Sequence, residues 1–318
     1  MTRLGLGFAG LGGLGQALLS DMKKFDDRLE VAAVQDIRLD LAEATAERHA
    51  ARWAGERFDD LLAVAGVDAV VLCTPNALHA PQAQAALHAG KDVLVQKPLA
   101  LSSADARATL DLAERFGRLL FVDYSYRFLD TMACFRTALA DLGPLRSART
   151  AFHNVYGPGA DKTWFFDARS SGGGALTDLG VHLLDLALWL LQPRRAELVT
   201  ADMVADGGVE TEAGLSLRLD HLLLSLDVSW NAPLPLTEIT FEVVSDSGAR
   251  LRWENVAGSF FRFRTVRDDA VLLERETTLR EDTLRVFSEA LRSRRTPAID
   301  LRTYELLDRA YRRPSSSV

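Results

Sequence analysis

Short apolar runs and amphipathic stretches alternate along the first third of the chain. The apolar runs lie at 4–8, 31–34, 67–72, 93–95 and 119–122, and each leads within two residues to glycine or to a polar residue. Between them, residues 39–48, 79–89 and 102–116 repeat apolar positions at helical spacing. Ser102, with Asp105 three residues later, is typical of a helix start. This repetition predicts a parallel sheet with helices on both faces.

The pattern changes from about residue 145 onward. Apolar and polar positions alternate over 222–230 and 239–243, which is the period of strands with one buried face. Further strands are predicted at 146–155, 197–204, 214–219, 250–253 and 260–266, and helices at 175–191, 282–292 and 303–311. We therefore expect an α/β protein with a doubly wound parallel sheet in residues 1–122. Residues 123–318 are expected to form an α/β domain with a mostly antiparallel open sheet.

Composition and charge narrow the class of partner. The 318 residues are 48% hydrophobic and 25% charged, with a net charge of −7, so no basic excess is available for nucleic acid or an anionic membrane. Cys73 and Cys134 lack metal-ligand spacing, which predicts reduced thiols and no metal site. The N-terminus does not resemble a signal peptide, and the apolar stretch at 179–191 is shorter than the ~20 residues of a membrane span. These features predict a cytoplasmic protein with a small-molecule partner and no membrane contact.

Residues 10–15 form the pattern G-x-G-x-x-G between a predicted strand and a predicted helix, and Asp36 follows at the end of the next strand. Such glycines let the backbone approach a pyrophosphate at a helix N-terminus, and the carboxylate accepts hydrogen bonds from an adenosine ribose. We therefore expect a dinucleotide site that contains Gly10, Gly12, Gly13, Leu14, Gly15 and Asp36. The alternative is a tight turn that binds nothing.

Two residues bear on the choice between NAD and NADP. The carboxylate of Asp36 would repel a 2′-phosphate, which favours NAD. Arg38 can pair with a 2′-phosphate if Asp36 rotates away, so NADP stays open. A solvated Arg38 at the start of the next helix is the alternative.

Polar residues follow two further strands of the predicted sheet. Thr74, Asn76 and His79 come after the strand at 67–72, where ligands of doubly wound sheets bind, although His79 can equally bond locally at a helix start. Lys97 follows the strand at 93–95, after Gln96. Because the chain has five lysines against 32 arginines, a strand-end lysine is a candidate for ammonium chemistry. A plain surface lysine is the alternative.

A run of three glycines at 172–174 precedes a predicted helix on which Asp178 and His182 are spaced i, i+4 and share one face. Histidine is suited to proton transfer near neutral pH, and a carboxylate one turn away can orient it or bind substrate hydroxyls. The alternative is a helix-surface pair with a purely structural role. Asp185, one turn further, is expected to support the fold.

Taken together, several segments resemble the glucose-fructose oxidoreductase / inositol dehydrogenase / rhizopine-catabolism (Gfo/Idh/MocA) family. They are Gly10-x-Gly12-x-x-Gly15, Thr74-Pro75-Asn76-x-x-His79, Gln96-Lys97-Pro98, Tyr126-Arg127-Phe128 and the run from Gly172 to His182. The resemblance implies an N-terminal Rossmann domain that binds NAD, with NADP possible, through the residues above together with Gln96 and Lys97. It also implies a C-terminal domain that holds substrate and forms the contacts of a homodimer or homotetramer.

By this resemblance Lys97, Asp178 and His182 occupy catalytic positions. His182 would remove the hydroxyl proton of the substrate, Lys97 would donate to the same oxygen, and Asp178 would orient the substrate or His182. The resemblance also implies that Tyr126, Arg127, Trp164, Lys162 and His153 line the substrate site. For the aromatic residues among them, the alternative is that they only pack between domains. The chain departs from the family at Gln96, where glutamate is usual, so that a negative charge beside Lys97 is missing.

The expected function is an NAD(P)-dependent oxidoreductase that acts on a hydroxyl-bearing carbon of a sugar, cyclitol or related polyol. A second hypothesis is a glycosidase of the same fold that oxidises and re-reduces the sugar on a retained NAD. A third is a non-catalytic regulator that senses the dinucleotide. The set of Lys97, Asp178 and His182 argues against this third hypothesis, because a sensor needs no proton-transfer group.

Overall fold

Two distant parts of the sequence form the first of two structural units. The computed structural model describes residues 3–312 apart from 26, 156–159, 206–207 and 233–236, and apart from the side chains of 160–162. One unit comprises Met1–Asp123 with Arg280–Ile299, and the other comprises Tyr124–Leu279 with Asp300–Val318. The sequence alone assigned 280–299 to the second domain. The helix at Arg280–Ser293 lies in the first unit, where Phe287 packs on Phe121, Arg280 pairs with Asp21, and Thr283 Oγ1 donates to Asp123 Oδ1 at 2.7 Å.

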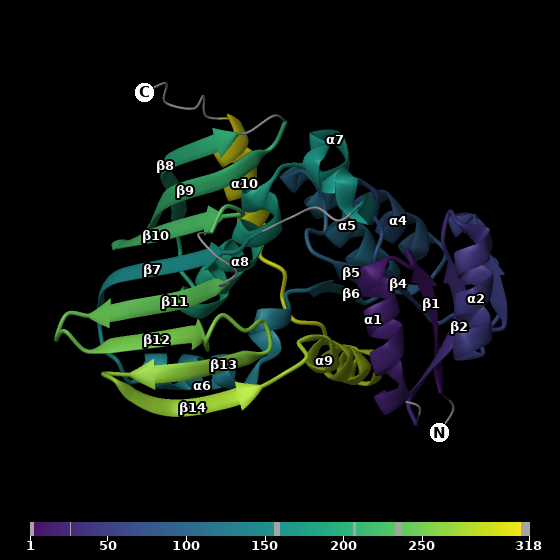
Figure 1. Ribbon diagram of the computed structural model, residues 1–318, viewed down its shortest axis with the longest axis horizontal. Coiled ribbons are helices and arrows are strands. Elements are labelled where there is room, and N and C mark those ends of the chain that lie inside the picture. Colours follow the sequence, from purple (N-terminus) through teal and green to yellow (C-terminus); the bar gives the residue numbers. More distant parts are fainter. Residues whose placement is uncertain (1–2, 26, 156–159, 206–207, 233–236, 313–318) are drawn as a thin grey trace. The chain divides into compact units, whose positions relative to one another are not determined.

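A six-stranded sheet forms the first unit (Figure 1). Its strands, in the spatial order β3-β2-β1-β4-β5-β6, are β1 Leu4–Ala9, β2 Leu29–Gln35, β3 Trp53–Gly55, β4 Ala69–Leu72, β5 Asp92–Gln96 and β6 Leu120–Asp123. Its helices are α1 Gly13–Asp21, η1 Met22–Phe25, α2 Leu39–His49, α3 Phe58–Ala63, α4 Asn76–His88, α5 Ser103–Phe116 and α9 Arg280–Ser293. All neighbouring strands are parallel, which confirms the predicted doubly wound sheet. The strand order reverses between β1 and β4, where such sheets bind ligands.

Local sequence signals account for the elements of this unit. Val70, Val71 and Leu94 are fully buried in central strands, as expected of a parallel sheet covered on both faces. Ser102 Oγ accepts a hydrogen bond from the backbone N–H of Asp105 at 3.1 Å and caps α5, as its spacing predicted.

An eight-stranded mixed sheet forms the second unit (Figure 1). Its spatial order is β14-β13-β12-β11-β7-β10-β9-β8, with β7 Leu145–His153, β8 Ala196–Ala205, β9 Glu210–Leu219, β10 Leu222–Ser229, β11 Glu238–Ser245, β12 Arg250–Asn255, β13 Arg262–Arg267 and β14 Ala270–Glu276. The helices are η2 Ser125–Phe128, α6 Asp130–Ala140, η3 Ala160–Phe166, α7 Ala168–Ser171, η4 Leu176–Gly180, α8 Val181–Leu191 and α10 Arg302–Arg312. Strand β10 is parallel to β7, and the other neighbouring pairs are antiparallel, so the predicted mostly antiparallel sheet is confirmed.

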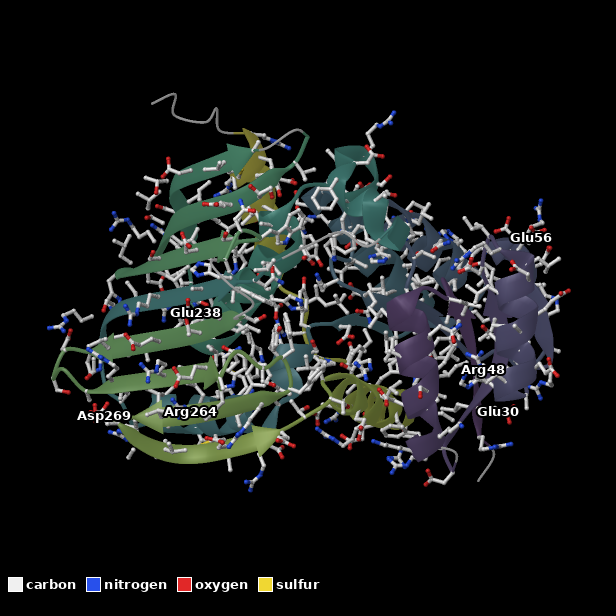
Figure 2. All side chains as sticks on the ribbon, viewed as in Figure 1. Glu30, Arg48, Glu56, Glu238, Arg264 and Asp269 are labelled. Atoms are coloured by element: carbon white, nitrogen blue, oxygen red, sulfur yellow. The ribbon has the colours of Figure 1, made fainter. Side chains whose placement is uncertain are left out.

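The two faces of this sheet differ in polarity. Leu224, Leu226 and Val228 of β10 are buried within the unit. The opposite face carries ion pairs between strands, such as Arg149 Nε with Glu242 at 3.0 Å and Arg264 Nη2 with Glu254 at 2.6 Å, and Figure 2 marks Glu238 and Arg264 on β11 and β13. The apolar strand residues therefore fill the core of the unit, so they do not support the predicted homodimer or homotetramer. The oligomeric state stays a prediction.

One helical run of the second unit is longer than the apolar stretch at 179–191 led us to expect. Ala168–Leu191 has the length and composition of a membrane span, but 83% of its most apolar window is buried inside the protein. It is therefore a core helix of this unit. The predicted helix at 175–191 is divided, because a π-helical turn, η4, precedes α8.

Candidate functional site

The loop between β1 and α1 needs glycine at two positions and leaves space at two others. Gly10 has φ +84°, and a Cβ there would lie 2.7 Å from the carbonyl carbon of Cys73. A Cβ on Gly15 would lie 2.2 Å from the carbonyl oxygen of Gly10. At Gly12 and Gly13, a Cβ would meet no described atom within 4 Å. Gly10 and Gly15 therefore close the turn, whereas Gly12 and Gly13 leave an open surface at the start of α1.

Asp36, which follows β2, is fixed against this loop. Its Oδ2 accepts from the backbone N–H of Leu11 at 2.8 Å. Its Oδ1 accepts from the backbone N–H of Arg38 at 3.0 Å and from Arg38 Nε at 3.3 Å. Asp36 is buried, whereas the side chain of Arg38 is exposed. The carboxylate is thus anchored, and the guanidinium pairs with it.

These residues fit a dinucleotide. The first turn of α1 has no side-chain cap and no acidic residue, and its N–H groups have no acceptor within the helix. Such N–H groups, together with the positive end of the helix dipole, bind phosphate oxygens. Gly12 and Gly13 give a pyrophosphate room to approach, Leu14 is exposed in the same turn, and Asp36 can accept from ribose hydroxyls.

Thr74, Asn76 and His79 lie around the turn between β4 and α4. Thr74 Oγ1 donates to Gln82 Oε1 at 2.6 Å, and Asn76 is the buried first residue of α4. The ring of His79 is 1% exposed, with Nδ1 2.7 Å from the carbonyl oxygen of Pro98 and Nε2 2.8 Å from that of Thr74. Burial lowers the pKa of His79, and these two hydrogen bonds oppose the shift. His79 therefore ties the turn after β4 to the turn after β5, and its ring nitrogens are engaged by protein rather than presented to a coenzyme.

Gln96 and Lys97 stand at the carboxyl end of β5. Gln96 is buried, and its Nε2 donates to Asp123 Oδ2 at 2.8 Å. Lys97 is half-buried. Burial raises the pKa of Asp123, and the hydrogen bonds from Thr283 and Gln96, followed by the charge of Lys97, oppose this shift. Lys97 therefore lies within electrostatic range of a buried carboxylate that no motif had indicated.

In the second unit, Tyr126 lies beside His182 and within electrostatic range of Asp178. Asp178 is part of the π-helical turn η4, a feature that is frequent at functional sites, and His182 is in the first turn of α8. Trp230 Nε1 donates to Asp178 Oδ2 at 3.3 Å. The ring of Tyr126 packs edge-on against His182 with centroids 4.9 Å apart. Burial, and then the charge of Asp178, raises the pKa of Tyr126, so its hydroxyl stays protonated.

Two residues that the sequence analysis did not single out hold the start of this helix. Glu210 Oε1 accepts from the backbone N–H groups of Gly174 at 2.8 Å and Leu176 at 3.0 Å, and from the Tyr311 hydroxyl at 2.7 Å. A Cβ on Gly174 would lie 1.8 Å from the carbonyl oxygen of Glu210, and one on Gly173 would lie 2.1 Å from Tyr311 Oη. The glycine run therefore lets β9 and α10 approach the helix start. Glu210 and Tyr311 are too distant in sequence for a local motif to reveal them.

Arg127 and His153, which were predicted to line a substrate cleft, both bond to carboxylates of the protein. Arg127 donates twice to Asp185 in a pair that is almost completely buried, so it links η2 to α8. His153 lies on the charged sheet face, with Nε2 2.6 Å from Asp227 Oδ1 and Nδ1 3.2 Å from Glu238 Oε2. Both side chains are thus occupied by protein carboxylates.

An aromatic group lies beside Asp178. The half-buried Trp164 packs on Phe165 with centroids 4.1 Å apart. Phe165 and Phe166 contact Trp230, whose indole donates to Asp178. The side chain of Lys162 lies outside the described part of the chain.

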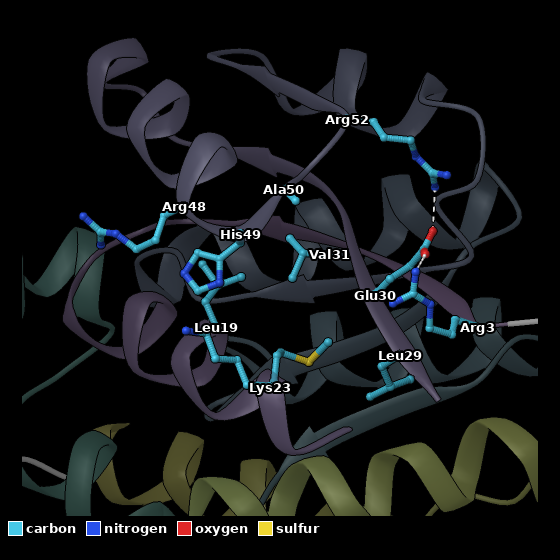
Figure 3. A pocket seen from close by; sticks show the side chains of 11 residues that line it. Arg3, Leu19, Lys23, Leu29, Glu30, Val31, Arg48, His49, Ala50 and Arg52 are labelled. Atoms are coloured by element: carbon cyan, nitrogen blue, oxygen red, sulfur yellow. Dashed lines mark ion pairs between the residues drawn. The ribbon is translucent and has the colours of Figure 1, made fainter. Parts of the chain in front are cut away.

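The first unit has a cavity of about 310 Å³ near the amino ends of β1 and β2 (Figure 3). Glu30 pairs there with Arg3 at 3.0 Å and with Arg52 at 2.9 Å. Burial, followed by the charges of Arg48 and Lys23, lowers the pKa of His49. Because the glycine loop follows the carboxyl end of β1, this cavity is separate from the dinucleotide loop.

Both units of the chain match family models of oxidoreductases. Residues 4–124 match the model of the oxidoreductase family with the NAD-binding Rossmann fold. Residues 138–250 match the model of the GFO/IDH/MocA C-terminal domain. The two matches together span most of the chain, which therefore belongs to the Gfo/Idh/MocA family.

Two of the relatives are named for reactions of sugars. The D-glucoside 3-dehydrogenase of Escherichia coli (strain K12) is 32% identical over 207 residues, which is 63% of this chain and 58% of that protein. The dTDP-3,4-didehydro-2,6-dideoxy-alpha-D-glucose 3-reductase of Streptomyces violaceoruber is 34% identical over 206 residues, or 60% of each chain. These matches span less than two thirds of either relative. The crystal structure of GenD2 from gentamicin A biosynthesis in complex with NAD is 29% identical, with a TM-score of 0.84 over 98% of this chain and 94% of that chain.

Proposed function

We propose that the protein is an NAD(P)-dependent oxidoreductase that transfers a hydride between nicotinamide and a hydroxyl-bearing carbon of a sugar, cyclitol or related polyol. The observation that carries this proposal is the β1–α1 loop. Gly12 and Gly13 leave an open surface there beside the anchored carboxylate of Asp36. A turn that serves only the fold would need neither feature.

The proposed chemistry divides among three side chains. The coenzyme, when bound, exchanges the hydride at C4 of its nicotinamide. His182 takes the proton from the substrate hydroxyl during oxidation and returns it during reduction. Lys97 donates a hydrogen bond to the same oxygen as negative charge develops on it. Asp178, whose Oδ2 is held by Trp230, orients the substrate or the His182 ring.

The coenzyme preference in this proposal is NAD. Asp36 is held by hydrogen bonds from Leu11 and Arg38, so it cannot rotate away without breaking them. The fixed carboxylate would repel a 2′-phosphate, and Arg38 already pairs with Asp36.

The names of the relatives suggest which substrates to test first. Both the glucoside 3-dehydrogenase and the dTDP-sugar 3-reductase act at position 3 of a hexose by name. We therefore propose glucosides and nucleotide-linked hexoses, and their 3-keto forms, as the first candidates, followed by inositols. The aromatic group of Trp164, Phe165 and Phe166 beside Asp178 suits the apolar face of such a ring.

A thermal-shift titration followed by turnover measurements tests this proposal. We expect NAD+ or NADH to raise the melting temperature and one polyol to raise it further, because ligands that bind only the folded state stabilise it. With that polyol, Lys97→Ala and His182→Ala should each lower kcat about 100-fold or more. Lys23→Ala and His88→Ala, at exposed positions, serve as matched controls. Full turnover in both Lys97→Ala and His182→Ala would refute the mechanism.

The same assays separate the other hypotheses. A redox-cycling glycosidase would cleave an aryl glycoside with NAD in catalytic amounts and no net NADH. A regulator would bind nucleotide tightly, turn over no polyol and co-purify with a partner protein. Light scattering on the eluted protein tests the predicted homodimer or homotetramer.

A further inference from the structure

A buried amide of the second unit has an oxygen without a hydrogen-bond partner. Asn154 directly follows β7 and is only 7% exposed. Its Oδ1 is enclosed, and no residue in the described part of the chain donates a hydrogen bond to it. Buried polar atoms are nearly always hydrogen-bonded, because an unpaired one has lost its hydration without compensation. This oxygen therefore needs an explanation other than the stability of the fold.

The backbone of Asn154 is fixed to the segment that carries Trp230. The N–H of Asn154 donates to the carbonyl oxygen of Ser229 at 2.9 Å, and its carbonyl oxygen accepts from the N–H of Ala232 at 3.1 Å. Trp230 lies between these two partners in the sequence, and its Nε1 donates to Asp178 Oδ2 at 3.3 Å. One short segment therefore holds both the backbone of Asn154 and the side chain of Asp178.

Strand alternation determines the side of the sheet on which the Asn154 side chain lies. The hydrogen bond of its N–H continues the ladder between β7 and β10. Successive side chains of a strand point to opposite faces, so Asn154 shares a face with Phe152, whereas His153 lies on the charged face. The ring of Phe152 packs against Tyr126 with centroids 6.1 Å apart, and Tyr126 packs against His182. The amide therefore lies on the same side of the sheet as the His182 ring.

We propose that Asn154 is a substrate-binding residue whose Oδ1 accepts a hydrogen bond from one hydroxyl of the polyol. This inference rests on the proposed function, in which the reacting hydroxyl gives its proton to His182 and receives a hydrogen bond from Lys97. Asn154 binds a different hydroxyl, since the reacting oxygen already has these two partners. An amide oxygen is suited to this role, because it accepts hydrogen bonds, carries no net charge and does not exchange a proton with the substrate.

The unpaired oxygen gives the site a preference for substrates that carry a hydroxyl at one ring position. Such a substrate supplies the missing donor to Oδ1, whereas a deoxy analogue leaves the oxygen buried and unpaired. A site built to bind a hydroxyl rejects the analogue that lacks it more strongly than an apolar pocket does, because its own polar group then stays without a partner. Asn154 thus determines specificity and takes no part in hydride or proton transfer.

The first test is thermal unfolding of the full chain and needs no substrate. Asn154→Leu replaces the amide by an apolar side chain of similar size, and no described donor loses its acceptor. The melting temperature should therefore stay within about 2 °C of the wild type or rise. Asn255→Leu is the matched control in the same unit. Asn255 Oδ1 accepts from the N–H of Ile239 at 2.8 Å and its Nδ2 donates to two carbonyl oxygens, so this variant should melt about 4 °C lower or more.

The second test compares a polyol with its monodeoxy analogues in the wild type and in Asn154→Leu. Methyl α-D-glucoside and myo-inositol are the first probes, followed by any other polyol that raises the melting temperature. In the wild type, one analogue that keeps the oxidised hydroxyl should have a kcat/KM at least about 30-fold below that of the parent polyol. In Asn154→Leu this ratio should fall to about threefold or less, because the parent has lost the same hydrogen bond. The affinity for NADH should stay within about twofold of the wild type in both variants.

An Asn154→Leu variant that melts as far below the wild type as Asn255→Leu would show that the amide supports the fold, and would overturn the inference. If Asn154→Leu does not fold, Asn154→Ala, whose shorter side chain cannot clash, is judged by the deoxy ratio alone. A wild type whose melting temperature no polyol raises would refute the proposed function and the inference with it. A wild type that turns over a polyol, combined with the same deoxy ratios in Asn154→Leu, would refute only the role of Asn154.

Discussion

Arg127 and Asp185 form a bidentate ion pair inside the second unit, with Arg127 Nε donating to Oδ2 and Nη2 donating to Oδ1. Their side chains are 4% and 1% exposed. The guanidinium also lies over the rings of Tyr124 at 5.3 Å and Trp189 at 5.6 Å. This pair fixes the segment with Tyr126 against α8, the helix that carries His182.

The variant Arg127→Met should be unstable in a pH-dependent way. Even beside Arg127, burial raises the pKa of Asp185 from 3.8 to about 7, and loss of the guanidinium would raise it further. The folded variant then binds more protons than the unfolded chain, so its stability falls as pH rises above about 4. We expect a loss of about 3–5 kcal/mol at pH 8 and a smaller loss at pH 5, measured by urea denaturation at both values.

The double variant Arg127→Met/Asp185→Leu is the control for this prediction. It has no buried carboxyl, so its own free energy of unfolding should change less between pH 5 and pH 8 than that of Arg127→Met. An equal loss for Arg127→Met at pH 5 and pH 8 would contradict the argument from the buried carboxylate.

Two substitutions in the glycine loop should separate an effect on NADH binding from an effect on folding stability. Gly12→Ala places its Cβ in open space, with φ −64° at this residue, so the melting temperature should stay within about 2 °C of the wild type. The methyl group would stand where a pyrophosphate approaches, and we expect NADH to bind at least about tenfold more weakly. Gly15→Ala forces a Cβ against the Gly10 carbonyl oxygen and should lose about 1–3 kcal/mol of stability. Fluorescence titration with NADH and thermal unfolding measure both effects.

The sequence predicted the fold because its strongest patterns are local. Alternation over 222–230, the apolar runs before residues 10 and 74, and the Ser102 cap each depend on neighbours within a few positions. It also predicted that Asp178 and His182 lie one turn apart in one helical run, since the i, i+4 spacing needs no tertiary information, although Asp178 lies in η4 and His182 in α8. The π-helical turn at η4 was missed, because it is stabilised by contacts from distant strands.

The supporting residues of the candidate site could not be predicted from one sequence. Glu210 meets Gly174 across 36 positions, Asp123 meets Thr283 across 160, and Trp230 meets Asp178 across 52. Such pairs form only when strands and helices have packed, and neither partner has a distinctive neighbourhood in the sequence. For the same reason Arg127 was predicted to line the substrate cleft, although its partner Asp185 buries it.

Asp36→Ser should shift the coenzyme preference toward NADP. The serine removes the charge that repels a 2′-phosphate and releases Arg38 from its ion pair, so the guanidinium becomes available to the phosphate. We expect kcat/KM for NADP+ to rise relative to NAD+ by about tenfold or more, measured on the substrate found by thermal shift. Asp36→Ser/Arg38→Ala should lose most of that gain. An unchanged ratio in Asp36→Ser would argue that Asp36 has only its structural bond to Leu11.

Loss of the Glu210 carboxylate should destabilise the protein more than loss of the Tyr311 hydroxyl that donates to it. Glu210→Ala leaves the N–H groups of Gly174 and Leu176 without their acceptor, and we expect a loss of about 2–4 kcal/mol. Tyr311→Phe removes one donor to Glu210 and one contact with Thr177, with an expected loss of about 1 kcal/mol. Denaturant unfolding of both variants checks this order, and the reverse order would show that the carboxylate does not hold the helix start.

Trp230→Phe should reduce turnover more than it reduces stability. Phenylalanine keeps the contacts with Phe165 and Phe166 but removes the indole N–H that donates to Asp178 Oδ2 at 3.3 Å. If that bond orients Asp178 toward the substrate, kcat should fall by about 3- to 10-fold, while the affinity for NADH stays unchanged. Steady-state kinetics and NADH titration measure the two quantities.

Trp253→Phe is the matched control, since its indole donates to Thr131 Oγ1 at 3.0 Å inside the same unit. This variant loses a buried hydrogen bond of the same kind and should lower the melting temperature, because a buried polar group loses its partner. Its kcat below the unfolding transition should stay within about twofold of the wild type. Equal decreases of kcat in the two variants would mean that the indole of Trp230 supports the fold of the second unit and has no particular role in orienting Asp178.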